Sequence, residues 1–294
     1  MKESPAFPSF PIPVAVIGPG TQVEGEALHY LNMPQGMETF RPPILPEPEE
    51  LVGHEQAHLA LRDVLACLGE TRTDGRNRSI DLTRLPPEDL KLINQVMGEG
   101  EVSAQVRTDD DAGQHVAVQE SVFAGVWRVI VSDGGKVVSD TMEVGAIPQV
   151  LRTSATDDLW ITVPRWQGAL PPNVQNAPAL LAEIEDQWRA WKPGTPAHVV
   201  NLTLLPMSNE DIGFMDHHLG TGRVLILSRG YGNCRITNTC VPNTWRVVYY
   251  NSQDLVILNT VEVSALPEVA MAAKEDLEDS FERLTEVLAW VEGD

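Results

Sequence analysis

"DTMEVGAIPQV", residues 140–150, recurs later in the chain as "NTVEVSALPEV", residues 259–269, with six of the eleven positions identical. The similarity extends toward the N-terminus from both stretches. "GVWRVIVS" matches "NTWRVVYYNS" around Trp127 and Trp245, and "DLTRLPPEDL" further upstream matches "NLTLLPMSNED". The order is kept, and the offset drifts only between 118 and 122 residues. This self-similarity predicts an internal duplication.

Each copy has the pattern of a short helix followed by four strands. A Leu-Pro turn precedes the predicted helices over 88–97 and 209–219. A Gly-x-Gly ends both helices, because glycine adopts the left-handed angles of a helix C-cap. Alternating β-branched segments with short connections follow, which is typical of an antiparallel sheet with a helix on one face. We therefore predict an α+β fold with two copies of a short helix plus a four-stranded antiparallel sheet.

The copies divide the chain into four parts. Residues 1–50 hold 10 of the 22 prolines and form a proline-rich N-terminal arm. Residues 51–155 contain a helix and the first copy, and residues 156–196 form a linker with its own helix. Residues 197–294 contain the second copy and a C-terminal helix, whose apolar residues recur at helical spacing.

The net charge of −21 restricts the classes of partner. Nucleic-acid binding depends on Lys and Arg neutralising phosphates, so no nucleic acid is expected, and anionic membranes are disfavoured likewise. A basic peptide or protein surface would be attracted at long range, although the charge could also serve solubility alone. Prolines interrupt the N-terminal apolar runs, and no stretch approaches the ~20 apolar residues of a membrane helix. We expect a cytoplasmic protein without membrane insertion.

The three cysteines do not suggest a disulfide framework. Aligned through the tryptophans, Cys234 falls opposite Val116 and Cys240 opposite Val122. Where one copy has valine, cysteine is most simply a small buried hydrophobe. Four thiolates would complete a tetrahedral metal site, and no Cys-x-x-Cys supplies half of one. We therefore expect neither a bound metal nor another cofactor.

"HEQAH", from His54 through Glu55 to His58, has the spacing of a zinc peptidase motif. Such a motif on a helix places two imidazoles on one face, with the glutamate positioned to activate a zinc-bound water. No pattern for a third ligand follows it, and the sequence contains no other catalytic set. We expect a protein that is not an enzyme and keep the zinc peptidase as the weaker alternative.

Differences between the copies indicate a surface for a partner. Near Arg229 the second copy replaces an acidic turn of the first by an arginine and a tyrosine between glycines, a composition common in binding hot spots. The alternative is a tight turn with its tyrosine packed on the sheet. The residues expected to bind a partner are Arg229, Tyr231, Asn233, Arg235, Tyr250 and Asn251, with Met33 and Met37 of the N-terminal arm.

Four stretches resemble a known family, the hydrogenase expression/formation proteins, also named HupH, HyaF or HoxQ. They are "LSRGYGNCRI", "WRVVYYNS", "VILNTVEVSALPEVAMAAKEDLEDSFERL" and, near the N-terminus, "GPGTQVEGEALHYLNMPQGMETFRPPILPEPEE". The resemblance covers most of the chain and is densest over residues 228–284.

The resemblance implies an accessory protein in the maturation of nickel–iron uptake hydrogenases. It implies a chaperone that binds the precursor of the iron–sulfur small subunit before twin-arginine export and that works beside other maturation proteins. The acidic charge would attract a basic twin-arginine leader on that precursor. The resemblance implies no catalytic residues. The rival hypothesis is a factor that handles a metal or an iron–sulfur cluster through Cys234 and histidines.

Overall fold

The computed structural model describes residues 53–107, 114–230 and 232–292. The N-terminal arm with Met33 and Met37, and also Tyr231, lie outside these residues. Contacts divide the described chain into two compact units. We call residues 53–152, 226–230 and 268–292 the N-unit, and residues 153–225 and 232–267 the C-unit. The predicted boundaries at residues 155 and 196 stay predictions.

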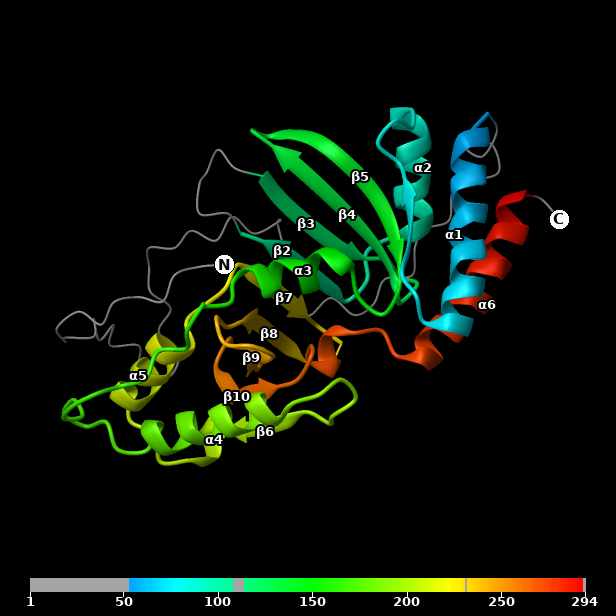
Figure 1. Ribbon diagram of the computed structural model, residues 1–294. Coiled ribbons are helices and arrows are strands. Elements are labelled where there is room, and N and C mark those ends of the chain that lie inside the picture. The colour runs from blue at the N-terminus through cyan, green and yellow to red at the C-terminus, as the bar shows by residue number, and fades with distance from the viewer. Residues whose placement is uncertain (1–52, 108–113, 231, 293–294) are drawn as a thin grey trace. The chain divides into compact units, whose positions relative to one another are not determined.

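The N-unit combines helices with an antiparallel sheet whose strand order is β1-β5-β4-β3-β2 (Figure 1). The helix α3 (Gln149–Asp157) follows β5, and its last residues are counted with the C-unit. The other elements are α1 (Glu55–Asp74), β1 (Arg78–Asp81), α2 (Pro87–Met97), β2 (Val102–Val106), β3 (Gln114–Glu120), β4 (Val126–Asp133), β5 (Lys136–Val144), the 3-10 helix η3 (Glu268–Ala270) and α6 (Lys274–Glu292).

The C-unit repeats this order of elements, with the strand order β7-β8-β9-β10-β6. Its elements are α4 (Ala177–Ala190), β6 (His198–Asn201), the 3-10 helix η2 (Leu202–Leu204), α5 (Asn209–Leu219), β7 (Val224–Ser228, of which residues 226–228 are counted with the N-unit), β8 (Asn233–Asn238), β9 (Thr244–Tyr250) and β10 (Val256–Val263).

The predicted α+β class is confirmed, and all eight predicted strands are present. Each sheet has in addition a fifth strand that was not predicted, β1 in the N-unit and β6 in the C-unit. Both are four residues long and pair along the last strand of their own copy. Strands this short carry too few residues for a clear alternation of apolar and polar side chains.

Backbone hydrogen bonds also match between the units. In both units, a glycine N–H after the helix donates to the last residue of the second strand. The last residue of the helix accepts the N–H of a residue in the turn after that second strand. The pairs are Gly100 N–H to Glu120 O at 2.7 Å and Gly222 N–H to Asn238 O at 2.8 Å, and Val122 N–H to Met97 O and Cys240 N–H to Leu219 O, both at 2.8 Å. Corresponding positions can therefore be compared directly, while the common origin of the copies stays a prediction.

Helices cover one face of each sheet. In the N-unit, α1 and α6 lie side by side and pack with α2 over apolar residues of β4 and β5, including Met142 and Val144 (Figure 1). The predicted apolar stripe of the C-terminal helix takes part in this core. In the C-unit, residues of α4 and α5 pack against Val200, Val261 and Val263.

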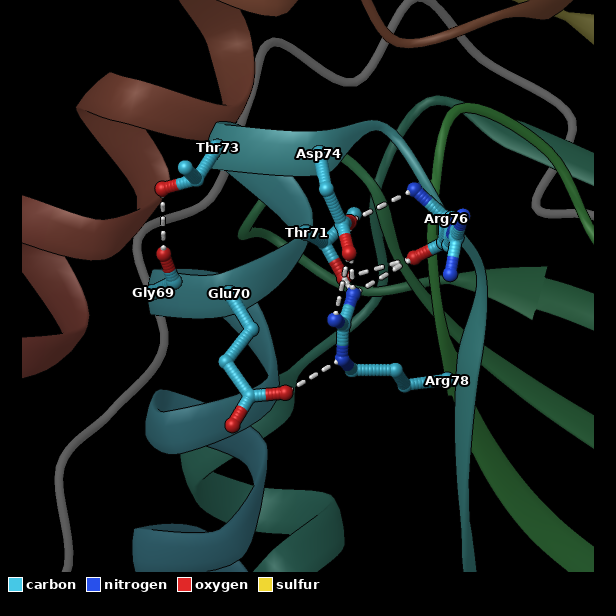
Figure 2. Close-up of polar contacts among 7 residues, drawn as sticks. All are labelled: Gly69, Glu70, Thr71, Thr73, Asp74, Arg76 and Arg78. Atoms are coloured by element: carbon cyan, nitrogen blue, oxygen red, sulfur yellow. Dashed lines mark hydrogen bonds and ion pairs between the residues drawn. The ribbon is translucent and has the colours of Figure 1, made fainter.

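Arg78 fastens the edge strand β1 to the end of α1 (Figure 2). Its guanidinium donates to the carboxylates of Glu70 at 2.6 Å and Asp74 at 2.8 Å, and to the carbonyl oxygen of Arg76 at 2.9 Å. The hydrogen bond from Arg78 holds the pKa of Asp74 well below its ordinary value. Exposed ion pairs stabilise weakly. This cluster does place charge on a strand edge, which discourages pairing with another chain.

Candidate partner-binding surface

Two residues of the predicted surface, Asn233 and Tyr250, lie at one end of the C-unit sheet. Asn233, Tyr250 and Val256 are register neighbours across β8, β9 and β10. Antiparallel neighbours on one face place their Cβ atoms about 5 Å apart, so the Asn233 and Tyr250 side chains are adjacent. Asn233 is exposed and Tyr250 is half-buried.

The other predicted residues are distributed differently. Arg235 lies two residues further along the same face of β8, opposite Val248, and is half-buried. Arg229 is exposed and belongs to the N-unit, where its backbone N–H donates to Glu101 O at 3.1 Å. The structure thus brings Asn233 and Tyr250 together, and binding by the predicted set stays a prediction.

Asn251 shapes the turn between β9 and β10. Its carboxamide oxygen accepts the N–H groups of Gln253 at 2.8 Å and Leu255 at 3.0 Å, and its own N–H donates to Leu255 O at 2.9 Å. An asparagine that bonds its own turn in this way replaces part of the backbone pairing. Asn251 therefore positions the residues that follow, whatever it contacts in a partner.

A group of exposed apolar residues lies at the same end of the C-unit sheet. The side chain of Thr203 accepts the N–H of Asn259 at 2.8 Å, which holds η2 against β10. Large apolar side chains of η2, the residue after it, the β9–β10 turn and the start of β10 are exposed there. We call this group the apolar patch: Leu204, Leu205, Leu255, Val256 and Ile257. No pattern in the sequence predicted it.

Both second-copy cysteines are buried, as are Val116 and Val122 at the matching positions. Burial raises the pKa of Cys234 to about 12. The thiolate is the form that attacks electrophiles and binds metals, and it is scarce at neutral pH when the pKa is this high. The described residues contain no group of three or more His, Cys, Asp or Glu placed to hold a metal ion.

The first histidine of "HEQAH" lies at the start of α1. His54 is the N-cap residue, and its Nδ1 lies 3.3 Å from Oδ1 of Asp89. The same Asp89 oxygen accepts the N–H of Ala57 at 3.2 Å. A carboxylate that accepts helix N–H groups stabilises the positive end of a helix. Asp211 does the same at the start of α4, where it accepts the N–H of Ala177 at 2.9 Å, so this arrangement has a structural explanation.

A buried carboxyl group in the N-unit gives a pH-dependent prediction. Glu120 is buried, and its side chain accepts the N–H of Gly125 at 3.2 Å. Desolvation by burial raises the pKa of Glu120 to about 7. Because the folded pKa exceeds the unfolded one, this group's contribution to stability is complete below pH ~4.5 and lost as pH rises through about 7.

We expect Glu120→Gln to flatten the pH dependence of unfolding. Between pH 5 and pH 9 the wild type should lose on the order of 2 kcal/mol that the variant keeps, because glutamine does not ionise. Urea unfolding at several pH values measures the difference. The exposed Glu99→Gln is the control and should follow the wild type. Parallel curves for wild type and Glu120→Gln would contradict the assignment.

The two units treat a matching arginine differently. In the N-unit, Arg128 donates to both carboxylate oxygens of Asp140, at 2.8 and 2.5 Å. The matching residues of the C-unit are Arg246 and Asn259, and Arg246 Nη1 and Asn259 Oδ1 are buried without a hydrogen-bond partner. The Arg246 Nη1 atom lies 3.3 Å from Oδ1 of Asp216.

Asn259→Asp should therefore stabilise the C-unit by about 1 kcal/mol, because it recreates a charge-assisted pair with two parallel hydrogen bonds. The matched change, Asp140→Asn, removes that pair in the N-unit and should cost about 2 kcal/mol. Thermal unfolding of both variants measures these shifts. A lower midpoint for Asn259→Asp would show that Arg246 gains nothing from a carboxylate here.

Comparison with known proteins supports one class. The family model described as "HupH hydrogenase expression protein, C-terminal conserved region" matches residues 55–167 and 174–291. The hydrogenase expression/formation protein HoxQ of Cupriavidus necator is 54% identical over 96% of this chain and 98% of its own. The hydrogenase expression/formation protein HupH of Rhodobacter capsulatus is 46% identical over 95% and 98%.

A solved structure of a hydrogenase expression protein HupH, from Thiobacillus denitrificans, matches with a TM-score of 0.37 and 25% identity. It covers 39% of this chain and 95% of its own. The family model and the two relatives define the class, that of proteins named for hydrogenase expression and formation. The chain belongs to the HupH family of hydrogenase expression/formation proteins, and the predicted resemblance is confirmed. Within the described ranges, none of the helices has the length and hydropathy needed to cross a membrane.

Proposed function

We propose that this chain is a cytoplasmic accessory chaperone of nickel–iron hydrogenase maturation, and that it binds the small-subunit precursor before export. The observation that carries the proposal is family membership over almost the whole chain, at 54% identity to a hydrogenase expression/formation protein. The proposed role requires binding and release and no bond-making chemistry.

Electrostatics support a basic partner. The chain has 42 acidic and 21 basic residues, a net charge of −21. A field of this sign attracts a cationic segment such as an arginine-containing leader and raises the rate of encounter, an effect that salt weakens. The buried and protonated Cys234 thiol fits this role better than one in metal or cluster transfer.

The proposal is tested by capturing the small-subunit precursor on the purified chain, with and without its leader, at low and high salt. We expect capture of the precursor, weakened by removing the leader and by salt. Failure to capture either form would overturn the proposal. Capture that is insensitive to both variables would remove the electrostatic part alone. Metal analysis of the same protein tests the rival hypothesis, since stoichiometric zinc or iron lost with Cys234→Ser would favour it.

A further inference from the structure

The apolar patch exposes side chains that a folded protein normally covers. Leu204 is 81% exposed and Ile257 is 56% exposed. Single exposed leucines are common on protein surfaces, but a contiguous apolar group marks an interaction site. Here five such residues come from two segments that the Asn259 N–H to Thr203 hydrogen bond links: η2 with the residue after it, and the β9–β10 turn with the start of β10.

The N-unit shows that the fold does not require apolar residues at two of these places. By strand register, Leu255 corresponds to Lys136, and by the matching "LTRLP" and "LTLLP" segments, Leu204 corresponds to Arg84. Both N-unit residues are polar and exposed. The register also matches Val256 and Ile257 with Val137 and Val138, which are exposed apolar residues of the N-unit. The C-unit therefore enlarges an exposed apolar surface at a place where the fold also accepts charged residues.

The edge strands of the two units also differ in polarity, since β1 carries more charge than β6. β1 carries Arg78, which is bonded to Glu70 and Asp74 of α1 (Figure 2). β6 carries at the matching position His198, bonded to Glu183 of α4 at 2.7 Å, followed by the exposed Val199. Among the described strands, β6 pairs only with β10, so its outer edge ends the sheet order. An edge with few charges and exposed apolar side chains favours pairing with an extended chain.

Charge decides between the candidate occupants. A second copy of this chain would bring another −21, and anionic lipid would also be repelled. An extended segment with apolar side chains could cover the apolar patch, and if it belongs to a net basic polypeptide the negative charge of the chain would attract it. We propose that the apolar patch is the docking site for such a segment. This assignment rests on the proposed function, whose partner is the small-subunit precursor with a basic leader.

Two variants test the assignment. Leu204→Gln/Ile257→Gln makes the patch polar without adding charge, and Leu204→Arg/Leu255→Lys gives it the residues of the N-unit. Glu99→Gln/Glu282→Gln is the control, because it adds the same two units of charge at exposed N-unit positions. The readout is the amount of small-subunit precursor captured from cells that express both proteins, with thermal unfolding of each variant as the check on folding.

We expect both patch variants to capture at least tenfold less precursor than the control, with unchanged unfolding midpoints because the replaced side chains are exposed. Capture equal to the control would overturn the assignment and leave the proposed function standing. A wild type that captures no precursor would overturn the proposed function and this assignment with it. Sedimentation of the chain alone gives a further outcome: a dimer that Leu204→Gln/Ile257→Gln converts to a monomer would make a second copy the occupant and overturn the assignment.

Discussion

Asp158→Ala should lower the free energy of unfolding by about 4 kcal/mol, the largest effect that we expect of a single substitution. Asp158 is fully buried, and it accepts from the backbone N–H and the Nε of Arg223, at 2.5 and 2.8 Å, and from the side chain of Asn238 at 3.0 Å. Removing it takes the shared carboxylate acceptor from the partly exposed Arg223 guanidinium and from the buried Asn238 amide.

The effect of Asp158→Ala should depend on pH. Burial alone would raise the pKa of Asp158, but the hydrogen bonds from Arg223 and Asn238 outweigh it and lower that pKa. A lowered folded pKa gives stability that is complete above the unfolded value and lost as pH falls through the folded one. The difference from wild type should therefore be largest at neutral pH and shrink below pH ~4. Guanidinium unfolding at several pH values measures it.

The neighbouring Asp157 provides the control. It is exposed at the end of α3, so Asp157→Ala should change the free energy of unfolding by less than about 0.5 kcal/mol. A loss for Asp158→Ala no larger than that for Asp157→Ala would show that the Asp158 network contributes little to the C-unit.

Gly100→Ala should cost about 3 kcal/mol. A Cβ at Gly100 would lie 2.2 Å from the carbonyl oxygen of Ser121 and 3.1 Å from that of Glu120. Both contacts are to backbone, which cannot rotate away as a flexible side chain can. The N–H of Gly100 also donates to Glu120 O at 2.7 Å, so relieving the clash would pull the two strands apart.

Gly134→Ala is the control for this substitution. Gly134 has a positive φ of 53° and no atom within 4 Å of an added Cβ, so it should show only the backbone cost of about 1 kcal/mol. Thermal unfolding of both variants gives the comparison. Equal midpoints would mean that the backbone of Ser121 lies further from Gly100 than the structure describes.

Local patterns predicted the strands and the short helices well. The segment of β2 alternates along its length, and Gly98 and Gly220 end their helices as expected, because such features depend on neighbours in sequence. The strands β1 and β6 were missed because four residues acquire strand geometry only by pairing with distant residues. Their pairing could have been expected from the position of each immediately before a repeated Leu-Pro turn.

The surface was harder to predict than the fold. The residues expected to bind a partner include Tyr250 and Asn233, and the structure places these two side by side. Leu204 is not among them, because a leucine in "NLTLLP" is as compatible with a core position as with an exposed one. Only the exposed fraction of the side chain distinguishes a buried leucine from an exposed one, and that fraction depends on tertiary structure.

The position of α6 has a consequence for synthesis on the ribosome. The helix α6 completes the core of the N-unit and is made after all the other described elements, whereas α1 emerges about two hundred residues earlier. At roughly 5–20 residues per second, the apolar face of α1 waits on the order of ten seconds or more for its partner. A nascent chain halted before Lys274 would leave that face without α6, so the nineteen residues of α6 determine when the N-unit can finish folding.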